Sequence, residues 1–330
     1  MLFLVPFCGC LQPSDEEVIV YTALDAEFSK PILDGYGKKS GLLVRPKFDT
    51  EATKTVGLFS AIEREKDRPR CDLFWNNEIL HTLRLERLGL LDPYESELAE
   101  NFPLQYRSPK GNWYGIAARA RVYLVNTDLL PENEYPTTIH DLTNEKWKGR
   151  GGIAKPLFGT TATHAAVLFD QWGAEKAKTF FTNVKANAKV FAGNKQVAQA
   201  VANGQLAFGL TDTDDAIVEI EKGHPVAIVY LDQKKDEMGT LFIPNTLAVI
   251  QGAPHREQAR KLLDYLLSEE VEQALAAGES AQFPLNKKIT VLPRVAENQK
   301  KIKQMEVDFY GAANQWDGAT AFLKGLFEGG

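Results

Sequence analysis

The chain has 330 residues with a formal net charge of −6, and 44% of its residues are hydrophobic and 25% charged. This is the composition of an ordinary globular protein, and the length exceeds that of one usual hydrophobic core, so we expect two lobes. The acidic balance excludes the basic footprint of a nucleic-acid-binding protein. No apolar run approaches the roughly 20 residues needed to cross a bilayer.

The first 17 residues are expected to lie outside the folded lobes. An apolar stretch, residues 1–7, is followed by Cys8-Gly9-Cys10 and then by polar residues. This pattern resembles the end of a bacterial lipoprotein signal, in which Cys10 becomes the acylated first residue, although Phe7 replaces the usual Leu and a basic leader is missing. The resemblance implies an exported protein of the periplasm or cell envelope, anchored to the membrane only by lipid. The alternative is a frayed apolar N-terminus.

Strands and helices alternate through the next seventy residues. Apolar strands are expected at 18–21, 42–48 and 72–75, with helices at 27–40, at 52–67 and from about 79 through Arg87. Each strand ends in polar residues, which begin at Thr22, Asp49 and Asn76 respectively. This alternation predicts a mostly parallel, doubly wound sheet, and such sheets bind ligands at the carboxyl ends of their strands.

Two long apolar runs, 113–126 and 240–250, enclose a second α/β block. In that block we expect strands at 151–154, 190–193, 206–210 and 226–230, with helices at 165–172, at 196–203 and from 217 onward. Helices at 257–267 and 269–277 and a C-terminal helical region follow. The runs predict two hinge strands that join one lobe of residues 18–118 and 245–290 to another of residues 119–244 and 291–330.

A cluster of Thr and Asp residues follows the apolar strand 206–210. It reads Thr211-Asp212-Thr213-Asp214-Asp215 and leads directly into a helical pattern. Asp and Thr are favoured helix caps, so a well-capped helix is one interpretation. The uninterrupted run exceeds what a cap needs, which favours a ligand site at this strand end.

The order of seven segments resembles the ferric-ion-binding family of periplasmic solute-binding proteins, the soluble receptors of ATP-driven importers. The segments are VIVYTALDAEF, CDLFWNNEI, WYGIAARARVYLVNT, GGIAKPLFGTT, AGNKQVAQAVANGQLAFGLTDTDDA, PNTLAVIQGAPHREQARKLLDYLLS and QFPLN. The resemblance implies an α/β, two-lobed periplasmic-binding-protein fold of type II, with each lobe a mostly parallel doubly wound sheet. It also implies a monomeric receptor that is not an enzyme and that works with a permease and an ATPase. Its cargo would be ferric iron or another metal with phosphate or carbonate as a co-ligand.

The resemblance carries over position by position, with departures. Asp25 stands where the family has a His, and Asn77 or Glu78 lies near the family's Glu. The hinge arginine corresponds to Arg119, with Arg121 as the other candidate.

The second block supplies the remaining positions. The family's anion-binding helix start corresponds to Gly159-Thr160-Thr161, and its Asn corresponds to Asn194. The family's adjacent tyrosine pair, which holds ferric ion, is replaced by Thr213 and Asp214.

The residues by themselves indicate two subsites. An anion would meet the helix start at Thr160 and Thr161 together with Arg119, unless the arginine forms a structural ion pair with Asp212 or Glu78. A hard cation would take carboxylate oxygens, with Asp25, Glu78 and Asp214 as metal ligands. Trp75 either stacks on an organic ligand or belongs to the core. The full set of expected ligand-binding residues is Thr22, Asp25, Trp75, Asn77, Glu78, Arg119, Gly159, Thr160, Thr161, Asn194, Asp212, Thr213 and Asp214.

Other functions remain open at this stage. A receptor for a small organic phosphate, phosphonate or other anionic solute would use the same cleft, with its anionic end at Arg119. An α/β enzyme has little support, because no G-x-S-x-G, P-loop or histidine–carboxylate–nucleophile pattern is present. A structural envelope lipoprotein would neither close around a ligand nor be stabilised by one.

Overall fold

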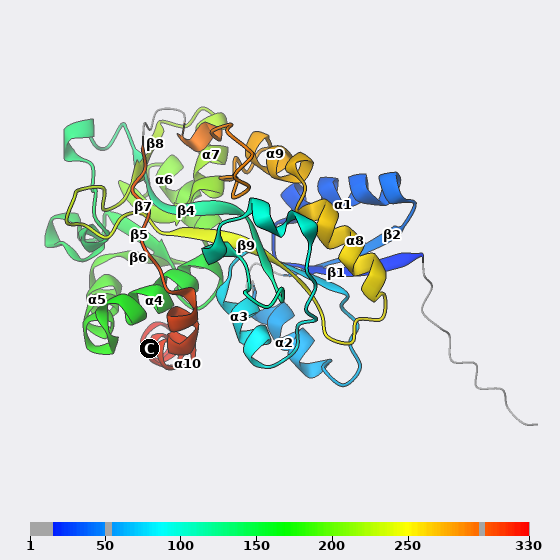
Figure 1. Ribbon diagram of the computed structural model, residues 1–330. Helices are drawn as coiled ribbons and strands as arrows, with labels where there is room; N and C mark the ends of the chain where they lie inside the picture. Colours follow the sequence, from blue (N-terminus) through cyan, green and yellow to red (C-terminus); the bar gives the residue numbers. More distant parts are fainter. Residues whose placement is uncertain (1–15, 50–54, 297–300, 330) are drawn as a thin grey trace, which may run out of the picture.

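The structure is a computed structural model that describes residues 16–49, 55–296 and 301–329. The expected lipid anchor at Cys10 and residues 52–54 of an expected helix lie outside these ranges. Two groups of strands, each with its own helices, lie side by side and are joined by the strands β4 and β9 (Figure 1).

The first lobe is built from three parallel strands and the helices that cover them. Strand β1 pairs in parallel with both β2 and β3, so their carboxyl ends meet at one edge. The strands of this lobe are β1 (Glu17–Thr22), β2 (Leu43–Phe48) and β3 (Leu73–Asn76). Its helices are α1 (Ala26–Ser40), α2 (Val56–Arg64), α3 (Leu80–Arg87), α8 (Arg256–Leu266) and α9 (Glu269–Ala277).

Alternation along each strand gives this lobe a core on both faces of the sheet. Val18 and Val20 pack with Leu33 of α1 and with α8, whereas Tyr21 packs on the opposite face with Phe59 of α2. Side chains of a strand point alternately to the two faces, and both faces are apolar here. The expectation of a doubly wound sheet is confirmed for this lobe.

The second lobe repeats this arrangement with its own strands. Strand β5 pairs in parallel with β6 and β7, and helices cover both faces. Its strands are β5 (Gly151–Ala154), β6 (Lys189–Phe191), β7 (Phe208–Asp212) and β8 (Val226–Tyr230). Its helices are α4 (Gly159–Trp172), α5 (Ala174–Asn187), α6 (Asn194–Ala202) and α7 (Thr213–Glu221).

The two hinge strands are β4 (Tyr114–Asn126) and β9 (Phe242–Val249). Residues 114–120 of β4 pair antiparallel with β9, which in turn pairs with β3, and residues 121–125 pair antiparallel with β7. The chain therefore passes from one sheet to the other between Ala120 and Arg121. The strands on either side keep the parallel pairing expected from the sequence, and the hinge strands add antiparallel pairs to it.

The last helix, α10 (Phe309–Glu328), packs on both lobes. Phe309 and Trp316 lie in a core with α2 and α3, whereas Leu323 lies in the core of the second lobe with α4 and α5. The sequence assigned residues 291–330 to the second lobe alone, but apolar side chains of α10 pack against both α3 and α4.

Two helices differ most from the sequence-based expectation. Helix α4 begins at Gly159, six residues before the expected start, and α5 was not expected at all. The signal for α5 is present, because Ala177, Phe180, Phe181 and Val184 have the i, i+3, i+4, i+7 spacing of a buried helix face. Among the described residues, no helix is both long enough and apolar enough to cross a membrane.

Candidate functional site

Helices α1, α4, α6 and α7 all begin at one pocket between the lobes. The pocket has about 450 Å³ of empty space, counting its open mouth. The first N–H groups of a helix have no acceptor within the helix, so converging helix starts favour negative charge. The pocket is lined by Asp25, Asn77, Arg119, Ala154, Lys155, Phe158, Gly159, Thr160, Thr161, Ala192, Gly193, Asn194, Asp212, Asp214 and Asp215.

Most of the residues expected from the sequence line this pocket. Those that do are Asp25, Asn77, Arg119, Gly159, Thr160, Thr161, Asn194, Asp212 and Asp214. The structure leaves the other four, Thr22, Trp75, Glu78 and Thr213, out of the lining. Trp75 is fully buried in the core of the first lobe, which corrects its place among the expected ligand-binding residues and agrees with the alternative that it belongs to the core. The hydroxyl of Thr213 accepts the backbone N–H of Ala120 at 3.1 Å, and that of Thr22 lies 3.5 Å from the carbonyl of Leu24.

Glu78 is a second correction. Its carboxylate is fully buried and accepts hydrogen bonds from the backbone N–H of Leu80 at 2.5 Å and from the Thr163 hydroxyl at 2.9 Å. It also accepts from the His81 ring and backbone, both at 2.9 Å, and burial, which would raise its pKa, is outweighed by His81, which lowers it. Glu78 therefore holds the start of α3 and contacts α4 across the lobes, and it is not available as a metal ligand.

A network of buried side chains connects the starts of α4, α6 and α7 at the wall of the pocket. Asp212 Oδ1 accepts from Arg121 Nη1 at 2.7 Å, and Asp212 Oδ2 accepts from the hydroxyl of Thr160 at 2.5 Å and from Asn194 Nδ2 at 3.0 Å. Arg121 also donates to the Thr161 hydroxyl at 3.1 Å, which itself donates to Asn194 Oδ1 at 2.9 Å. Burial alone would raise the pKa of Asp212, but Arg121 and Arg119 hold it below its usual value.

This network changes the expected anion subsite. The sequence paired Arg119 with Thr160 and Thr161, but Arg121 is the arginine that contacts both hydroxyls. Arg121 is fully buried and forms the structural ion pair with Asp212 that was the alternative interpretation. Because both hydroxyls donate within the network, the groups of α4 left to meet an anion are the backbone N–H groups of its first turn.

Arg119 is the arginine that faces the pocket. Its side chain is 4% exposed; Nη1 lies 3.4 Å from Asp214 Oδ2, and Nη2 donates to the carbonyl of Asn77. Burial opposes the charge of Arg119, but Asp214, Asp212 and Asp25 raise its pKa, so the guanidinium stays charged. Asn77 Oδ1 is buried and has no hydrogen-bond partner among the described residues.

Three carboxylates of the Thr/Asp cluster come close enough to share a cation. Asp212, Asp214 and Asp215 each offer an oxygen, and these oxygens all lie within 4.8 Å of one another. Both oxygens of Asp212 are engaged by the buried network. Asp214 Oδ2 lies 3.4 Å from Arg119 Nη1, and Asp214 Oδ1 accepts the backbone N–H of Asp215 at 3.0 Å. Oxygen donors at this spacing suit a hard cation.

Sequence reasoning missed two charged residues of the pocket, Lys155 and Asp215. Lys155 directly follows strand β5, so the strand-end rule that selected Asp25 would also have found it. Its Nζ lies 3.7 Å from Glu328 Oε1, near the end of α10. Asp215 belongs to the same acidic run as Asp214, but the family's tyrosine pair corresponds to Thr213 and Asp214 and does not include Asp215.

The fold and the pocket define a two-lobed ligand-binding protein of the periplasmic-binding-protein type. The chain belongs to the bacterial extracellular solute-binding protein family, whose sequence profile matches residues 81–309. The resemblance seen in the order of the seven segments is thereby confirmed. The family is one of extracellular proteins, so the place of this chain is expected outside the cytoplasmic membrane.

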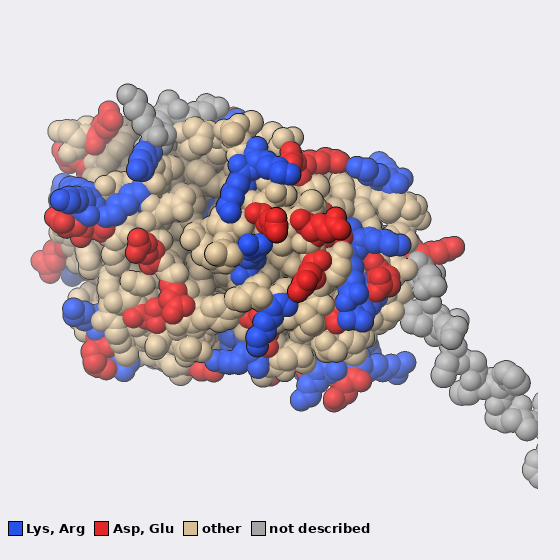
Figure 2. Space-filling model, in the orientation of Figure 1, with Lys and Arg blue, Asp and Glu red and all other residues tan. Residues whose placement is uncertain are grey.

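Figure 2 shows acidic and basic side chains interspersed over the visible face, with no broad basic surface.

Individual relatives are distant but cover most of the chain. The major ferric iron-binding protein of Neisseria meningitidis serogroup A is 24% identical over 282 residues, which are 83% of this chain and 82% of that protein. The structure resembles iron-bound HitA from Pseudomonas aeruginosa with a TM-score of 0.81 and 23% identity, covering 94% of this chain and 99% of that one. It resembles AfuA from Actinobacillus pleuropneumoniae, which has fructose-6-phosphate bound, with a TM-score of 0.82 and 22% identity, covering 94% and 98%. The structural likenesses establish the fold.

Proposed function

We propose that this chain is the cargo-binding receptor of an ATP-driven importer and that it captures a hard metal ion, ferric iron first, together with a small anion. The observation that carries this proposal is the group of carboxylate oxygens from Asp212, Asp214 and Asp215 in the interlobe pocket. Ferric iron-binding proteins among the relatives support the choice of cargo. The proposed action is capture and release, without chemistry on the cargo.

The proposed metal ligands come from both lobes. Asp214 and Asp215 begin α7 in the second lobe, whereas Asp25 precedes α1 in the first. Asp25 and Asp214 keep the role expected from the sequence, and Asp215 takes the place of Glu78. A cation that bridges these carboxylates would relieve their mutual repulsion, and it would hold the two lobes together.

The proposed anion lies at the starts of α4 and α6. The backbone N–H groups near Gly159 and Asn194 and the ammonium group of Lys155 supply positive charge there. Phosphate or carbonate at this position would complete the coordination shell of the metal. No tyrosine lines the pocket among the described residues, so the anion and water would replace the family's phenolates.

Cargo binding is proposed to close the lobes about the hinge strands β4 and β9. The lobes proposed are residues 18–118 with 245–290 and residues 119–244 with 291–330, with α10 packed on both. A permease and an ATPase are the proposed partners of the closed, monomeric receptor. Acylation at Cys10 is proposed to tether the receptor to the envelope.

Metal analysis followed by calorimetry tests the proposed cargo. Protein purified without chelators is expected to carry a metal that elemental analysis and native mass spectrometry detect. After the metal is removed, titration with ferric nitrilotriacetate plus phosphate or carbonate should show binding at micromolar concentration or tighter. Asp214→Asn should weaken this binding, and the exposed Asp236→Asn should leave it unchanged. Absence of binding for ferric and divalent metals, with or without these anions, would overturn the proposal.

A receptor for a small phosphorylated solute is the second candidate. The pocket has a positive side, formed by the starts of α4 and α6 with Lys155, and a negative side, formed by Asp25 and Asp214. Such a pocket suits a molecule with a phosphate at one end and hydroxyl or ammonium groups at the other. AfuA, which shares the fold, has fructose-6-phosphate bound. Calorimetric binding of a sugar phosphate by metal-free protein, combined with no metal binding, would favour this candidate.

A further inference from the structure

A buried carboxylate lies at the hinge, away from the pocket. Glu272 of α9 is fully buried. One of its oxygens accepts the backbone N–H of Ala117 in β4 at 2.6 Å. Its other oxygen accepts the backbone N–H groups of Leu285 at 2.6 Å and Asn286 at 3.1 Å. A single side chain thus connects α9, a hinge strand and the segment that follows α9.

Ala117 is the irregular point of the hinge strand. The pairing of β4 with β9 shifts register between Ile116 and Ala118, and Ala117 has a φ of 32°, in the region that non-glycine residues rarely adopt. Such a conformation persists only where the surroundings hold it. The carbonyl of Ala117 accepts from the side chain of Asn245 in β9, so both polar groups of this peptide segment are bound by buried side chains.

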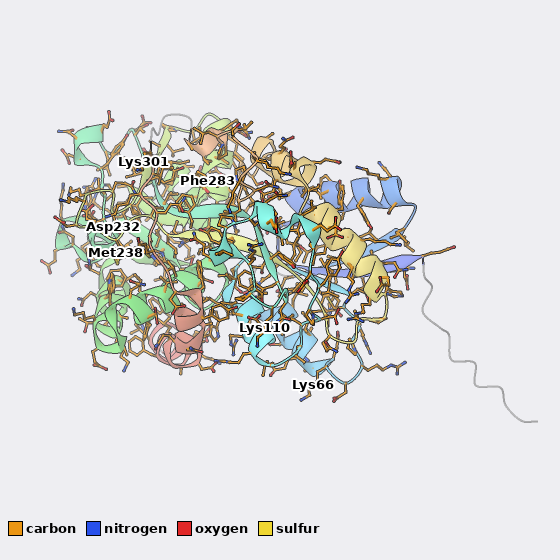
Figure 3. All side chains as sticks on the ribbon, viewed as in Figure 1. Lys66, Lys110, Asp232, Met238, Phe283 and Lys301 are labelled. Atoms are coloured by element: carbon orange, nitrogen blue, oxygen red, sulfur yellow. The ribbon has the colours of Figure 1, made fainter. Side chains whose placement is uncertain are left out.

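The next residue extends the same connection. Ala118 exchanges both backbone hydrogen bonds with Phe283, at 2.7 and 2.8 Å. Phe283, labelled in Figure 3, in turn packs on Phe242 of β9, with the ring centroids 4.9 Å apart. Segment 283–286 is therefore held to the irregular point of β4 from one side by Phe283 and from the other by Glu272.

Glu272 lacks a cationic partner among the described residues. Three nearby cationic side chains are paired with other carboxylates: Arg119 of β4 with Asp214, Lys288 with Glu269, and Arg294 with Glu221. Lys287, which follows Asn286, is exposed. Strand β9 carries no titratable residue. Burial raises the pKa of Glu272 to about 6, and its three backbone donors lower it only in part.

We propose that Glu272 is a positioning residue of the hinge, which as a carboxylate fixes the irregular point of β4 and, when protonated, lets the lobes open more freely. Both oxygens of the ionised carboxylate accept hydrogen bonds from backbone N–H groups. When the group is protonated, one of these oxygens carries a proton that faces a backbone N–H group, so the hydrogen bond at that oxygen is weakened. The connection to Ala117 or to Leu285 and Asn286 is weakened. This proposal rests on the two-lobed fold and is independent of which cargo the pocket takes.

Interlobe distances in the ligand-free protein test the proposal. Spin labels at Lys38→Cys and Asn183→Cys, two exposed positions on α1 and α5, with Cys8→Ser and Cys10→Ser, would report the distance by pulsed electron resonance. We expect a broader distribution, extended to longer distances, at pH 5 than at pH 7.5. Glu272→Gln should show the broad distribution at both pH values, because its amide offers one acceptor. The matched control is Glu269→Gln on the same helix, which should behave like the parent.

Hydrogen exchange supplies a second readout that does not depend on the variant folding well. After correction for intrinsic rates, exchange in peptides that contain Ala117 and Leu285 should quicken in the parent protein between pH 7.5 and pH 5, while core peptides of β1 stay protected. A distance distribution that is the same at both pH values, or protection at Ala117 that does not change, would overturn the proposal. A pH response that Glu272→Gln retains would do so as well.

Discussion

Arg121 and Asp212 form a buried ion pair, with Arg121 Nη1 2.7 Å from Asp212 Oδ1, beside the ligand pocket that Asp212 lines. Arg121 comes from the hinge strand β4 and Asp212 from the end of β7, and these two residues are directly opposed in the antiparallel register of the strands. The pair joins Thr160 and Asn194, so a residue of the hinge fixes the starts of two helices that line the pocket.

Removal of Arg121 should therefore cost more than an ordinary salt bridge. Arg121→Ala would leave Asp212 buried without its main partner, and breaking a buried pair in this way costs roughly 3–5 kcal/mol. We expect that loss in the free energy of unfolding measured by urea denaturation. Arg87→Ala, on the exposed side of α3, should change it by less than about 1 kcal/mol. A loss for Arg121→Ala no larger than for this control would contradict the structural role of the pair.

The strand ends are the part of the site that the sequence predicts well. Asp25, Asn77, Asn194 and Asp214 all follow β-strands, and parallel strands bring their carboxyl ends to one edge. The hinge strands are equally visible, because long apolar runs stand out from the shorter strands of the lobes. This much follows from local pattern.

The choice between neighbouring side chains does not follow from local pattern. Arg119 and Arg121 are two residues apart, and both point to the same side of β4, so only the crossing of the chain between the two sheets separates their roles. Glu78 differs from Asn77 by one residue, yet its carboxylate is taken by the N–H groups that start α3. The engagement of α10 with both lobes depends on packing between distant segments.

No tyrosine lines the pocket within the part of the chain that the structure describes, and this has a spectroscopic consequence. We expect the ferric-loaded protein to lack the visible tyrosinate-to-iron charge-transfer band, because its oxygen donors are carboxylates, water and the anion. Asp214→Tyr would place a phenol at one of the two positions where the family has tyrosine, and a visible band should then appear on titration with ferric nitrilotriacetate. Leu129→Tyr, at an exposed position outside the pocket, is the control and should produce no band. A visible band in the ferric-loaded parent protein would contradict the proposed ligands.

An ion pair between Lys195 of α6 and Glu27 of α1 connects the two lobes. Lys195 Nζ lies 3.5 Å from Glu27 Oε1, and both side chains are about half exposed. Water and salt screen such pairs, and their usual contribution is under about 1 kcal/mol. Lys195→Ala should therefore change the free energy of unfolding by less than about 1 kcal/mol, with the difference disappearing in 1 M salt. A loss of several kcal/mol in the free energy of unfolding, measured by urea denaturation, would contradict this small contribution.

His164 should make the protein less stable as the pH falls. It is buried in α4, and neither ring nitrogen has a hydrogen-bond partner among the described residues. Burial and the nearby Arg121 lower its pKa from 6.5 to about 3. The unfolded chain therefore takes up a proton as the pH falls below about 6.5, whereas the folded protein does not until about pH 3. The stability that the neutral ring contributes is fully present above about pH 6.5 and is lost as the pH falls from about 6.5 toward 3.

Between pH 7 and pH 5 this difference corresponds to about 2 kcal/mol of lost unfolding free energy. Glu272 acts in the opposite direction, because its raised pKa makes the folded protein bind a proton first, and it offsets roughly 1 kcal/mol over the same interval. The pKa of Asp232 is likewise raised to about 6 by burial, so Asp232 acts in the same direction as Glu272. His164→Gln, which cannot titrate, should remove the loss from His164 and keep these gains, so that this variant loses less stability on acidification than the parent. Urea denaturation at pH 7 and pH 5 measures both slopes, with the exposed His140→Gln as the matched control. Equal slopes for His164→Gln and the parent would mean that the ring titrates normally in the folded protein.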